Sequence, residues 1–306
     1  MPPVADQGAV SPAVVRGRRI FLQRAALGGA ALLTSAFRGR PASASSPREL
    51  HLALLSDTHV PGDRQQGYRG MNPWEHLRVA AGQVAAARPD GIVICGDIAR
   101  LEGREEDYRE LRALLEPVAA VAPVYIAPGN HDDRANLLKV FPDRPGRPAP
   151  VEGRLVTVVE HEALRLVVLD SLLYVNQVAG LLGHAQRAWL SSFLPQVADR
   201  PVVLFVHHPP TDEDGDLLDG DRLLTIVRAN PHVKALFHGH AHVWSIGRCD
   251  RLPMVSLPSL GYSFEDAQPV GWVDARFRAD GVSLRLRVVD GNRAEDGQET
   301  FLAWPA

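Results

Sequence analysis

The chain has 306 residues, of which 45% are hydrophobic and 23% charged, with 26 Gly, 24 Pro and two Cys. This ordinary globular composition excludes collagen-like, intrinsically disordered and disulfide-scaffold proteins. The net charge of −3 is uneven: residues 1–44 carry six Arg and one Asp, which leaves 27 basic and 35 acidic residues, a net charge of −8, in 45–306. Residues 45–306 are too acidic for a protein that coats nucleic acid, because such binding requires clustered Lys and Arg.

The first 44 residues have the pattern of an export signal. Arg18-Arg19 is followed by Phe21-Leu22, by the mild apolar stretch Ala25–Phe37, and by the small residues Ala42-Ser43-Ala44. A basic region, a short apolar run and A-x-A are typical of a signal peptide, and the run is shorter than the ~20 residues of a membrane span. The paired arginines resemble a bacterial twin-arginine (Tat) signal, with an uncleaved amphipathic leader or a Sec signal as alternatives. We therefore expect export through the Tat machinery to the periplasm or outside the cell, with residues 45–306 as one domain.

Six mainly apolar runs of strand length follow this segment. Their nearly continuous apolar character predicts strands covered on both faces. The runs are Leu50–Leu55, Gly91–Cys95, Val124–Ala127, Leu164–Leu169, Val202–Val206 and Val233–Phe237. Helical patterns lie between several of them: one begins at Asn72-Pro73 and stops before Pro89, and three others cover Tyr108–Leu115, Leu190–Val197 and Leu223–Val227. The alternation predicts an α/β protein with right-handed parallel crossovers.

Antiparallel strands are added later in the chain. Val270–Phe277 and Val282–Val289 flank a turn at Ala279-Asp280-Gly281, which predicts a β-hairpin. Arg154–Glu160 and Leu164–Asp170 have the pattern of a second hairpin. The sequence thus predicts mixed β-sheets.

Two loops and two cysteines allow more than one interpretation. Phe141–Pro150 contains four prolines, so we expect irregular structure there. Thr211–Asp221 contains six acidic residues, but their spacing does not fit a calcium-binding EF-hand, so a solvated acidic loop is the favoured interpretation. Cys95 lies in an apolar run and Cys249 in a predicted turn, and a bridge between them stays open.

Five of the predicted strands end in side chains that can bind metals. These are Asp57 and His59 after the first strand, Asp97 after the second, Asn130, His131 and Asp132 after the third, His207 and His208 after 202–206, and His238, His240 and His242 after 233–237. Any one of them could be a helix cap, a turn residue or a buried histidine. Together they indicate a common binding site at the carboxyl edge of the sheet, where open α/β sheets bind their ligands. Converging carboxylates and neutral imidazoles require a cation, and nitrogen and oxygen donors without cysteine suit Zn, Mn or Fe.

In this order, Asp57-x-His59, Gly96-Asp97, Gly129-Asn130-His131-Asp132, His207 and Gly239-His240-Ala241-His242 resemble the motifs of the calcineurin-like metallophosphoesterases. The resemblance spans residues 57–242 and implies a four-layer α/β/β/α sandwich of two mixed β-sheets flanked by helices, with two divalent metal ions. It implies one metal on Asp57, His59 and His242, the other on Asn130, His207 and His240, and Asp97 as the bridge. His131 would be the catalytic histidine beside the substrate, oriented by Asp132.

The reaction that this resemblance implies is phosphoester hydrolysis. Two ions (Mn, Fe or Zn) would lower the pKa of a bridging water and clamp the phosphoryl oxygens, hydroxide would attack phosphorus, and His131 would protonate the leaving group. The position three residues after Asp97 is Arg100 instead of the tyrosine ligand of purple acid phosphatases, which disfavours that branch. The segment Gly129–Arg134 resembles the cyclic-nucleotide and glycerophosphodiester phosphodiesterase branch.

We therefore expect an exported hydrolase that acts on a small phosphodiester. The alternatives are a phosphate-scavenging phosphomonoesterase and a non-catalytic metal- or phosphate-binding protein of the same fold. The candidate substrate contacts are His131, Asn130 and Arg100, although Arg100 could instead form an ion pair with Glu102 or Glu105.

Overall fold

A computed structural model describes residues 48–120 and 122–306. The predicted signal peptide, residues 1–44, lies outside the described residues. Among the described helices, none combines the length and the apolar character that a bilayer crossing requires.

The first sheet has six strands in the order β13-β12-β11-β1-β2-β3. Its parallel half consists of β1 (Leu50–Leu55), β2 (Gly91–Cys95) and β3 (Val124–Ala127). Its antiparallel half consists of β11 (Pro269–Arg278), β12 (Gly281–Gly291) and β13 (Glu299–Ala303). The parallel register places the ends of β1, β2 and β3, and the motif residues that follow them, at one edge.

The second sheet has seven strands in the order β4-β5-β6-β7-β8-β10-β9. Four neighbouring strands are parallel: β6 (Arg165–Val168), β7 (Val202–Phe205), β8 (Val233–His238) and β10 (Leu252–Ser256). Antiparallel strands complete both sides, namely β5 (Thr157–Glu160) with β4 (Arg147–Pro148), and β9 (Ser245–Cys249).

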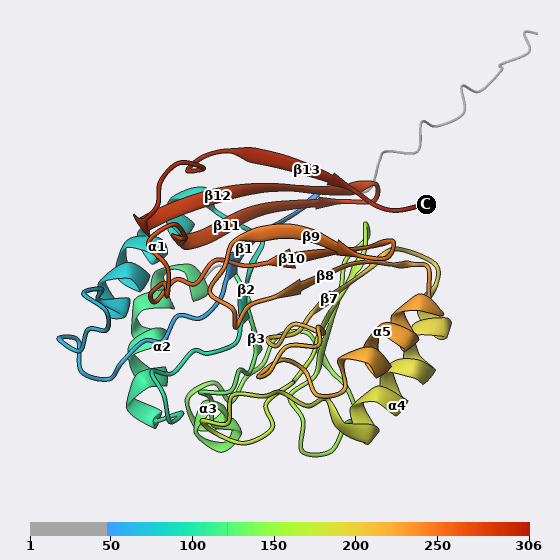
Figure 1. The fold of residues 1–306 in the computed structure, drawn as a ribbon, viewed down its shortest axis with the longest axis horizontal. Coiled ribbons are helices and arrows are strands. Elements are labelled where there is room, and N and C mark those ends of the chain that lie inside the picture. Colours follow the sequence, from blue (N-terminus) through green and yellow to red (C-terminus); the bar gives the residue numbers. More distant parts are fainter. Residues whose placement is uncertain (1–47, 121) are drawn as a thin grey trace, which may run out of the picture. The chain divides into compact units, whose positions relative to one another are not determined.

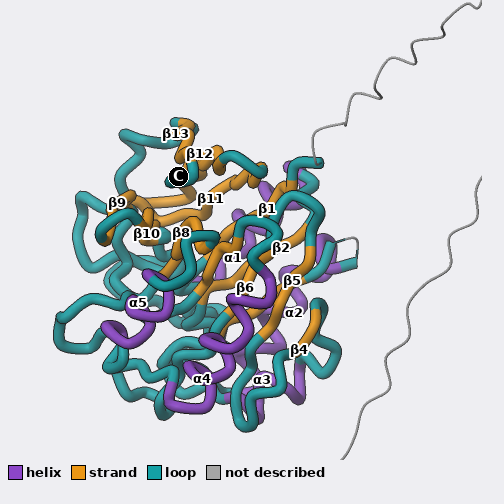
Figure 2. Tube along the Cα trace, turned by 90° about the vertical axis from the view of Figure 1, so that its right-hand side faces the viewer, coloured by secondary structure: helices purple, strands orange, loops and turns teal. Residues whose placement is uncertain are grey.

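Helices cover the outer faces of the two sheets (Figure 1). On one side, α1 (Pro73–Ala87) and α2 (Glu105–Ala119) share a buried cluster with the first sheet, and α3 (Arg134–Val140) packs against α2. On the other, α4 (Gly183–Phe193), the short 3₁₀ turn Leu194–Val197 and α5 (Gly220–Arg228) share a cluster with the second sheet. Figure 2 is viewed from this side, with α4 and α5 in front of the strands. A third cluster, which includes Leu54, Val93, Phe205 and Phe237, fills the space between the sheets. The predicted four-layer α/β/β/α sandwich is confirmed.

Local sequence signals explain where the first helix begins and ends. The Asn72 side chain accepts a hydrogen bond from the Glu75 amide (3.2 Å), and Pro73 occupies the first turn, where no amide hydrogen is needed. Arg88 ends α1 in the left-handed conformation with a φ of 50°, directly before Pro89. α1 therefore has the bounds that the sequence predicts.

Other segments differ from the prediction. The strands β9, β10 and β13 and the helix α3 were not predicted, and the proline-rich segment 141–150 contains the two-residue strand β4. Cys249 is the last residue of β9 instead of a turn residue. Both cysteines are free, with Cys95 buried, so the bridge that the sequence left open is not formed.

Candidate metal centre

The predicted metal ligands lie on turns at the carboxyl ends of strands from both sheets. Asp57 and His59 follow β1, Asp97 follows β2, and His240 and His242 follow β8, and all five have φ between 41° and 69°. Residues other than glycine rarely adopt this left-handed backbone conformation, which costs about 1–3 kcal/mol each. Such strain at five predicted ligands indicates a site whose geometry is selected for a purpose other than stability.

One group of donors consists of Asp57, His59 and His242. One donor atom from each lies within 4.8 Å of the others, and all three residues are buried. The His242 Nε2 atom lies 3.4 Å from Asp57 Oδ1 and 3.1 Å from His59 Nε2. These are the residues that the family resemblance assigns to one metal.

The other group gathers around Asp97 and His207. His207 Nε2 lies 3.3 Å from Asp97 Oδ1 and 3.2 Å from Asn130 Oδ1, and donor atoms of Asp57, Asp97 and His207 lie within 4.8 Å of one another. Asp97 Oδ2 is also 3.7 Å from His59 Nε2, so this carboxylate contacts members of both groups. Donor atoms of His207, His208 and His240 are also within 4.8 Å of one another. The structure thus brings all seven predicted ligands together.

Backbone carbonyls orient three of these imidazoles. The Nδ1 atoms of His59, His207 and His242 face the carbonyl oxygens of Arg100 (3.3 Å), Cys95 (2.8 Å) and Tyr262 (2.8 Å). With a metal bound, a proton on Nδ1 would satisfy each carbonyl and the Nε2 lone pair would be available to the metal. This is the arrangement by which proteins present neutral histidine to a metal.

Burial and mutual contact perturb the titration of the cluster. Burial lowers the pKa of His59 to about 3 and that of His240 to about 4. Burial opposes the charged form of His207 as well, but the Asp97 and Asp57 carboxylates outweigh it and raise the pKa of His207 to about 9. The histidines likewise hold the pKa of Asp97 well below its usual range against the effect of burial.

The donor set fits divalent metal ions. The two buried carboxylates, the amide oxygen of Asn130 and the free Nε2 atoms of histidines are hard and borderline ligands of the kind that Zn, Mn and Fe prefer. Two negative charges out of contact with water call for a positive counter-charge, which a metal supplies without a proton.

The surroundings of His131 correct one part of the sequence prediction. His131 Nδ1 faces the Leu101 carbonyl oxygen (3.0 Å) and its Nε2 points toward Asp97 Oδ2 (3.9 Å). In the described part of the chain, no hydrogen bond or ion pair joins the Asp132 carboxylate to the His131 ring. Its carboxylate accepts hydrogen bonds from the amides of Ile98, Ala99 and Gly129 and from the Tyr108 hydroxyl. The Leu101 carbonyl therefore orients His131, whereas Asp132 holds the loops after β2 and β3 together.

Arg100 does not form the ion pair with Glu102 or Glu105 that the sequence offered as an alternative. Glu102 forms an ion pair with Arg104 and Glu105 with Arg109, while the Arg100 guanidinium stacks on the rings of Tyr68 and Tyr262. The Tyr262 ring in turn lies 4.7 Å from that of His59. Arg100 is therefore beside the cluster.

Sequence reasoning missed the residues that support Asp57. The Ser56 hydroxyl donates to the Cys95 carbonyl (2.9 Å) and contacts the Asp57 carboxylate, and the Ser259 hydroxyl donates to the Asp57 carbonyl (3.0 Å). Ser259 follows β10, which is parallel to β8 and so ends at the same edge. Polar residues directly after an apolar strand indicated the other parts of the site. The same signal marks the loop that begins at Leu257, but only once β10 is known to be a strand.

The acidic segment Thr211–Asp221 is only partly solvated. Asp219 is buried and accepts hydrogen bonds from the amides of Leu182 and Gly183 at the start of α4, so the interpretation of a solvated loop is wrong for this residue. Gly215 approaches the cluster, because a Cβ atom at this position would lie 3.8 Å from His240 Nε2. The loop therefore borders the site.

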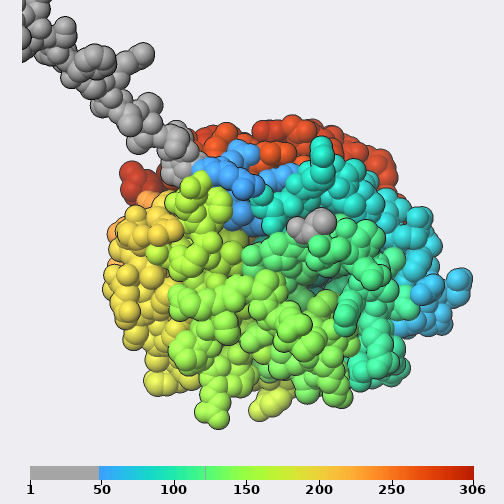
Figure 3. All heavy atoms as spheres, turned by 180° about the vertical axis from the view of Figure 1, so that it is seen from behind, coloured from blue at the N-terminus to red at the C-terminus, as the bar shows by residue number. Residues whose placement is uncertain are grey.

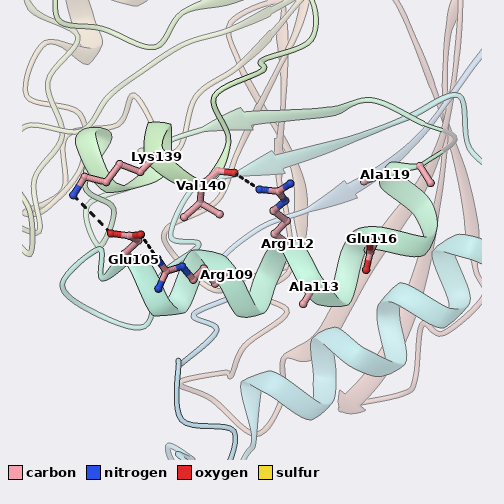
Figure 4. Close-up of a pocket in the computed structure, with 9 residues that line it drawn as sticks. Glu105, Arg109, Arg112, Ala113, Glu116, Ala119, Lys139 and Val140 are labelled. Carbon is pink, nitrogen blue, oxygen red and sulfur yellow. Dashed lines mark hydrogen bonds and ion pairs between the residues drawn. The ribbon is translucent and has the colours of Figure 1, made fainter.

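A separate groove of about 640 Å³ lies between α2 and α3. Figure 3 shows the face opposite to that of Figure 1, where these two helices lie in the green part of the chain. In this groove Glu105 pairs with Arg109 and Lys139, and Arg112 donates to the Val140 carbonyl (Figure 4). It contains none of the predicted ligands, so we do not take it for the reactive site.

Comparisons with known proteins agree with the geometry. A family model described as calcineurin-like phosphoesterase matches residues 50–244. A probable cyclic nucleotide phosphodiesterase of Rhodococcus erythropolis is 33% identical over 253 residues, which cover 79% of this chain and 81% of the relative. The glycerophosphodiester phosphodiesterase GpdQ of Enterobacter lignolyticus is 30% identical, over 71% of this chain and 81% of the relative. A cAMP/cGMP dual specificity phosphodiesterase of Mycobacterium tuberculosis is 31% identical, over 79% of this chain and 77% of the relative.

A solved structure has the same fold at low identity. The dimetal phosphatase of Danio rerio superimposes with a TM-score of 0.64 and 17% identity, over 83% of this chain and 99% of that one. The fold and the family match thus agree with the buried cluster of Asp and His donors, and so do the relatives that match most of the chain. The chain belongs to the calcineurin-like phosphoesterase family and is a metal-dependent phosphoester hydrolase.

Proposed function

We propose that the protein is an exported phosphodiesterase with a binuclear metal centre. The observation that carries the binuclear part is the position of Asp97, whose Oδ1 lies 3.3 Å from His207 and whose Oδ2 lies 3.7 Å from His59. A carboxylate placed between two donor groups can bridge two cations ~3.5–4 Å apart. The relatives named as phosphodiesterases support a diester as substrate.

The ligands would be divided as the two donor groups suggest. One ion would be held by Asp57, His59 and His242, the second by Asn130, His207 and His240, and both by Asp97. Divalent ions held by these residues would supply positive charge for the phosphoryl oxygens and would lower the pKa of a bound water.

His131 is the proposed proton donor to the departing alcohol. Its amide donates to Asp97 Oδ1 (2.9 Å) and its Nδ1 faces the Leu101 carbonyl, which directs Nε2 toward the cluster. In the protonated imidazole Nε2 carries a hydrogen, and transfer of this proton to the leaving oxygen contributes typically ~10²–10⁴-fold to the rate. Because Nε2 is 3.9 Å from Asp97 Oδ2, the His131 imidazole, unlike the His131 amide, is outside direct hydrogen-bond distance of that carboxylate.

A panel of metals and substrates tests the activity. The protein without residues 1–44 is stripped of metal, reloaded with Mn²⁺, Zn²⁺ or Fe²⁺, and assayed with an aryl diester, an aryl monoester, a cyclic nucleotide and a glycerophosphodiester. We expect metal-dependent turnover that is fastest with a diester. Faster hydrolysis of the monoester would favour the phosphomonoesterase, and no turnover with any metal would leave a metal- or phosphate-binding protein.

The export proposal rests on residues 1–44. Replacement of Arg18-Arg19 by two lysines should leave the protein in the cytoplasm of a bacterial host with a Tat pathway, whereas the unaltered chain should reach the periplasm. The exported protein should begin at Ser45 if cleavage follows Ala44. Normal export of the lysine variant would contradict the Tat assignment.

A further inference from the structure

A buried arginine beside the donor cluster has no anionic partner among the described residues. Arg100 exposes only 9% of its surface. Its Nε atom is buried without a hydrogen-bond partner, and the two nearby glutamates that could have paired with it, Glu102 and Glu105, bind other arginines. A guanidinium nitrogen buried without an acceptor lowers the stability of a protein. The position therefore suggests a charge kept for a ligand.

Two tyrosines fix this charge next to the cluster. The guanidinium carbon lies 4.9 Å from the ring centroid of Tyr68 and 5.7 Å from that of Tyr262. The Tyr262 ring is 4.7 Å from the His59 ring and 4.8 Å from the His242 ring, centroid to centroid. The Arg100 carbonyl also accepts the hydrogen bond that orients His59. The arginine thus belongs to the His59–His242 side of the site.

The charge of the substrate decides what an additional cation does there. A simple phosphodiester carries one negative charge, whereas a phosphomonoester carries close to two at neutral pH. We propose that Arg100 binds an anionic oxygen that a simple diester lacks, so that the site accepts phosphoesters with a second negative charge. This inference rests on the proposed function and names the charge class of its substrate. The second charge is either the other ionised oxygen of a monoester or an anionic group on the alcohol of a diester.

Kinetics with three substrates tests the inference. The substrates are a neutral-alcohol aryl diester, an aryl monoester, and a diester whose alcohol carries a second phosphate. In Arg100→Met, kcat/KM should fall by about 10–100-fold for at least one doubly charged substrate, as expected from the loss of a hydrogen bond between charged groups, and by much less for the simple diester. Arg100→Lys should restore part of the loss. The doubly charged substrate that is affected identifies the source of the second charge.

The matched control is Arg104→Gln, which removes an exposed arginine from the same loop. It should change none of the three rates. An equal loss for all three substrates in Arg100→Met, or no loss, would overturn the inference. If the wild-type protein hydrolyses none of them, the proposed function fails, and the following measurement still tests Arg100.

Thermal unfolding with inorganic phosphate supplies a readout besides activity. Phosphate should raise the unfolding midpoint of the wild type and of Arg104→Gln more than that of Arg100→Met. Without phosphate, Arg100→Met should unfold no earlier than the wild type, because the substitution removes a buried Nε atom that has no hydrogen-bond partner. If Arg100→Met unfolds earlier and phosphate stabilises it as much as the wild type, the arginine is structural and the inference is wrong.

Discussion

Replacement of Gly129 by alanine should disable the site by moving Asp97. A Cβ atom at Gly129 would lie 2.3 Å from both the amide nitrogen and Oδ1 of Asp97, and 2.8 Å from His207 Nε2. Ordinary contacts begin at 3.4 Å, so the backbone of Asp97 must shift by about 1 Å. A displacement of this size at a reacting centre can reduce the rate about 100-fold, and overpacking costs roughly 1–3 kcal/mol of stability.

The assay compares Gly129→Ala with a second glycine substitution. Gly82 lies on the exposed face of α1, and a Cβ atom there would meet no atom within 4 Å outside the helix's own backbone. Gly82→Ala should therefore stabilise the protein by roughly 0.5–1 kcal/mol with unchanged turnover. Metal content, kcat/KM for an aryl diester and urea denaturation are measured for both. A Gly129→Ala protein with wild-type metal content and rate would refute the close-packing argument.

Four further predictions concern the cluster itself. Asp97→Ala should abolish metal binding and hydrolysis together; metal analysis checks this, and a normal metal content would exclude Asp97 as the bridge. His131→Ala should keep its metal but lose roughly 10²–10⁴-fold in kcat, and an unchanged rate in the loaded variant would remove His131 from the mechanism. Chelation should lower the unfolding midpoint and added Mn²⁺ should restore it in a concentration-dependent way, whereas a midpoint indifferent to metal would argue against the site. The metal-free protein should be most stable near pH 6.5. Above pH 6.5, stability is lost as the pH rises through the pKa of His207, which burial opposes but Asp97 and Asp57 raise to about 9. Below pH 6.5, burial keeps His59 and His240 neutral in the folded protein, with pKa values of about 3 and 4. Stability therefore falls with pH, because the same histidines bind protons in the unfolded chain. The alkaline loss approaches about 3 kcal/mol, and a flat profile in urea denaturation would contradict these shifts.

Much of the fold was readable because its strands are covered on both faces. β1, β2, β7 and β8 are nearly continuous apolar runs, and the polar residues directly after them mark the edge where the site forms. β9 carries no such signal, because Ser245–Cys249 is largely exposed at the end of its sheet. β10 follows it after a tight turn, and its five residues begin with Leu252-Pro253, which obscures the run.

The role of Asp132 could not be read from local sequence. Its partners Ile98, Ala99 and Tyr108 are 24–34 residues away along the chain, so only the folded arrangement reveals them. The same applies to Arg100, because the two rings that surround its guanidinium come from loops near residues 68 and 262. Strand-end patterns thus locate donor atoms, whereas contacts between loops decide how the donors are oriented.

The donor cluster takes its members from both sheets. Asp57 and Asp97 follow strands of the first sheet, while His207 and His242 follow strands of the second. An ion held by both would act as a cross-link between the two layers and would close a chain segment that runs from residue 57 to residue 242. The two cysteines form no disulfide, so a bound metal would fasten the halves of the sandwich in the way a covalent bridge does in other proteins. Loss of metal would then loosen the packing between the sheets as well as end catalysis.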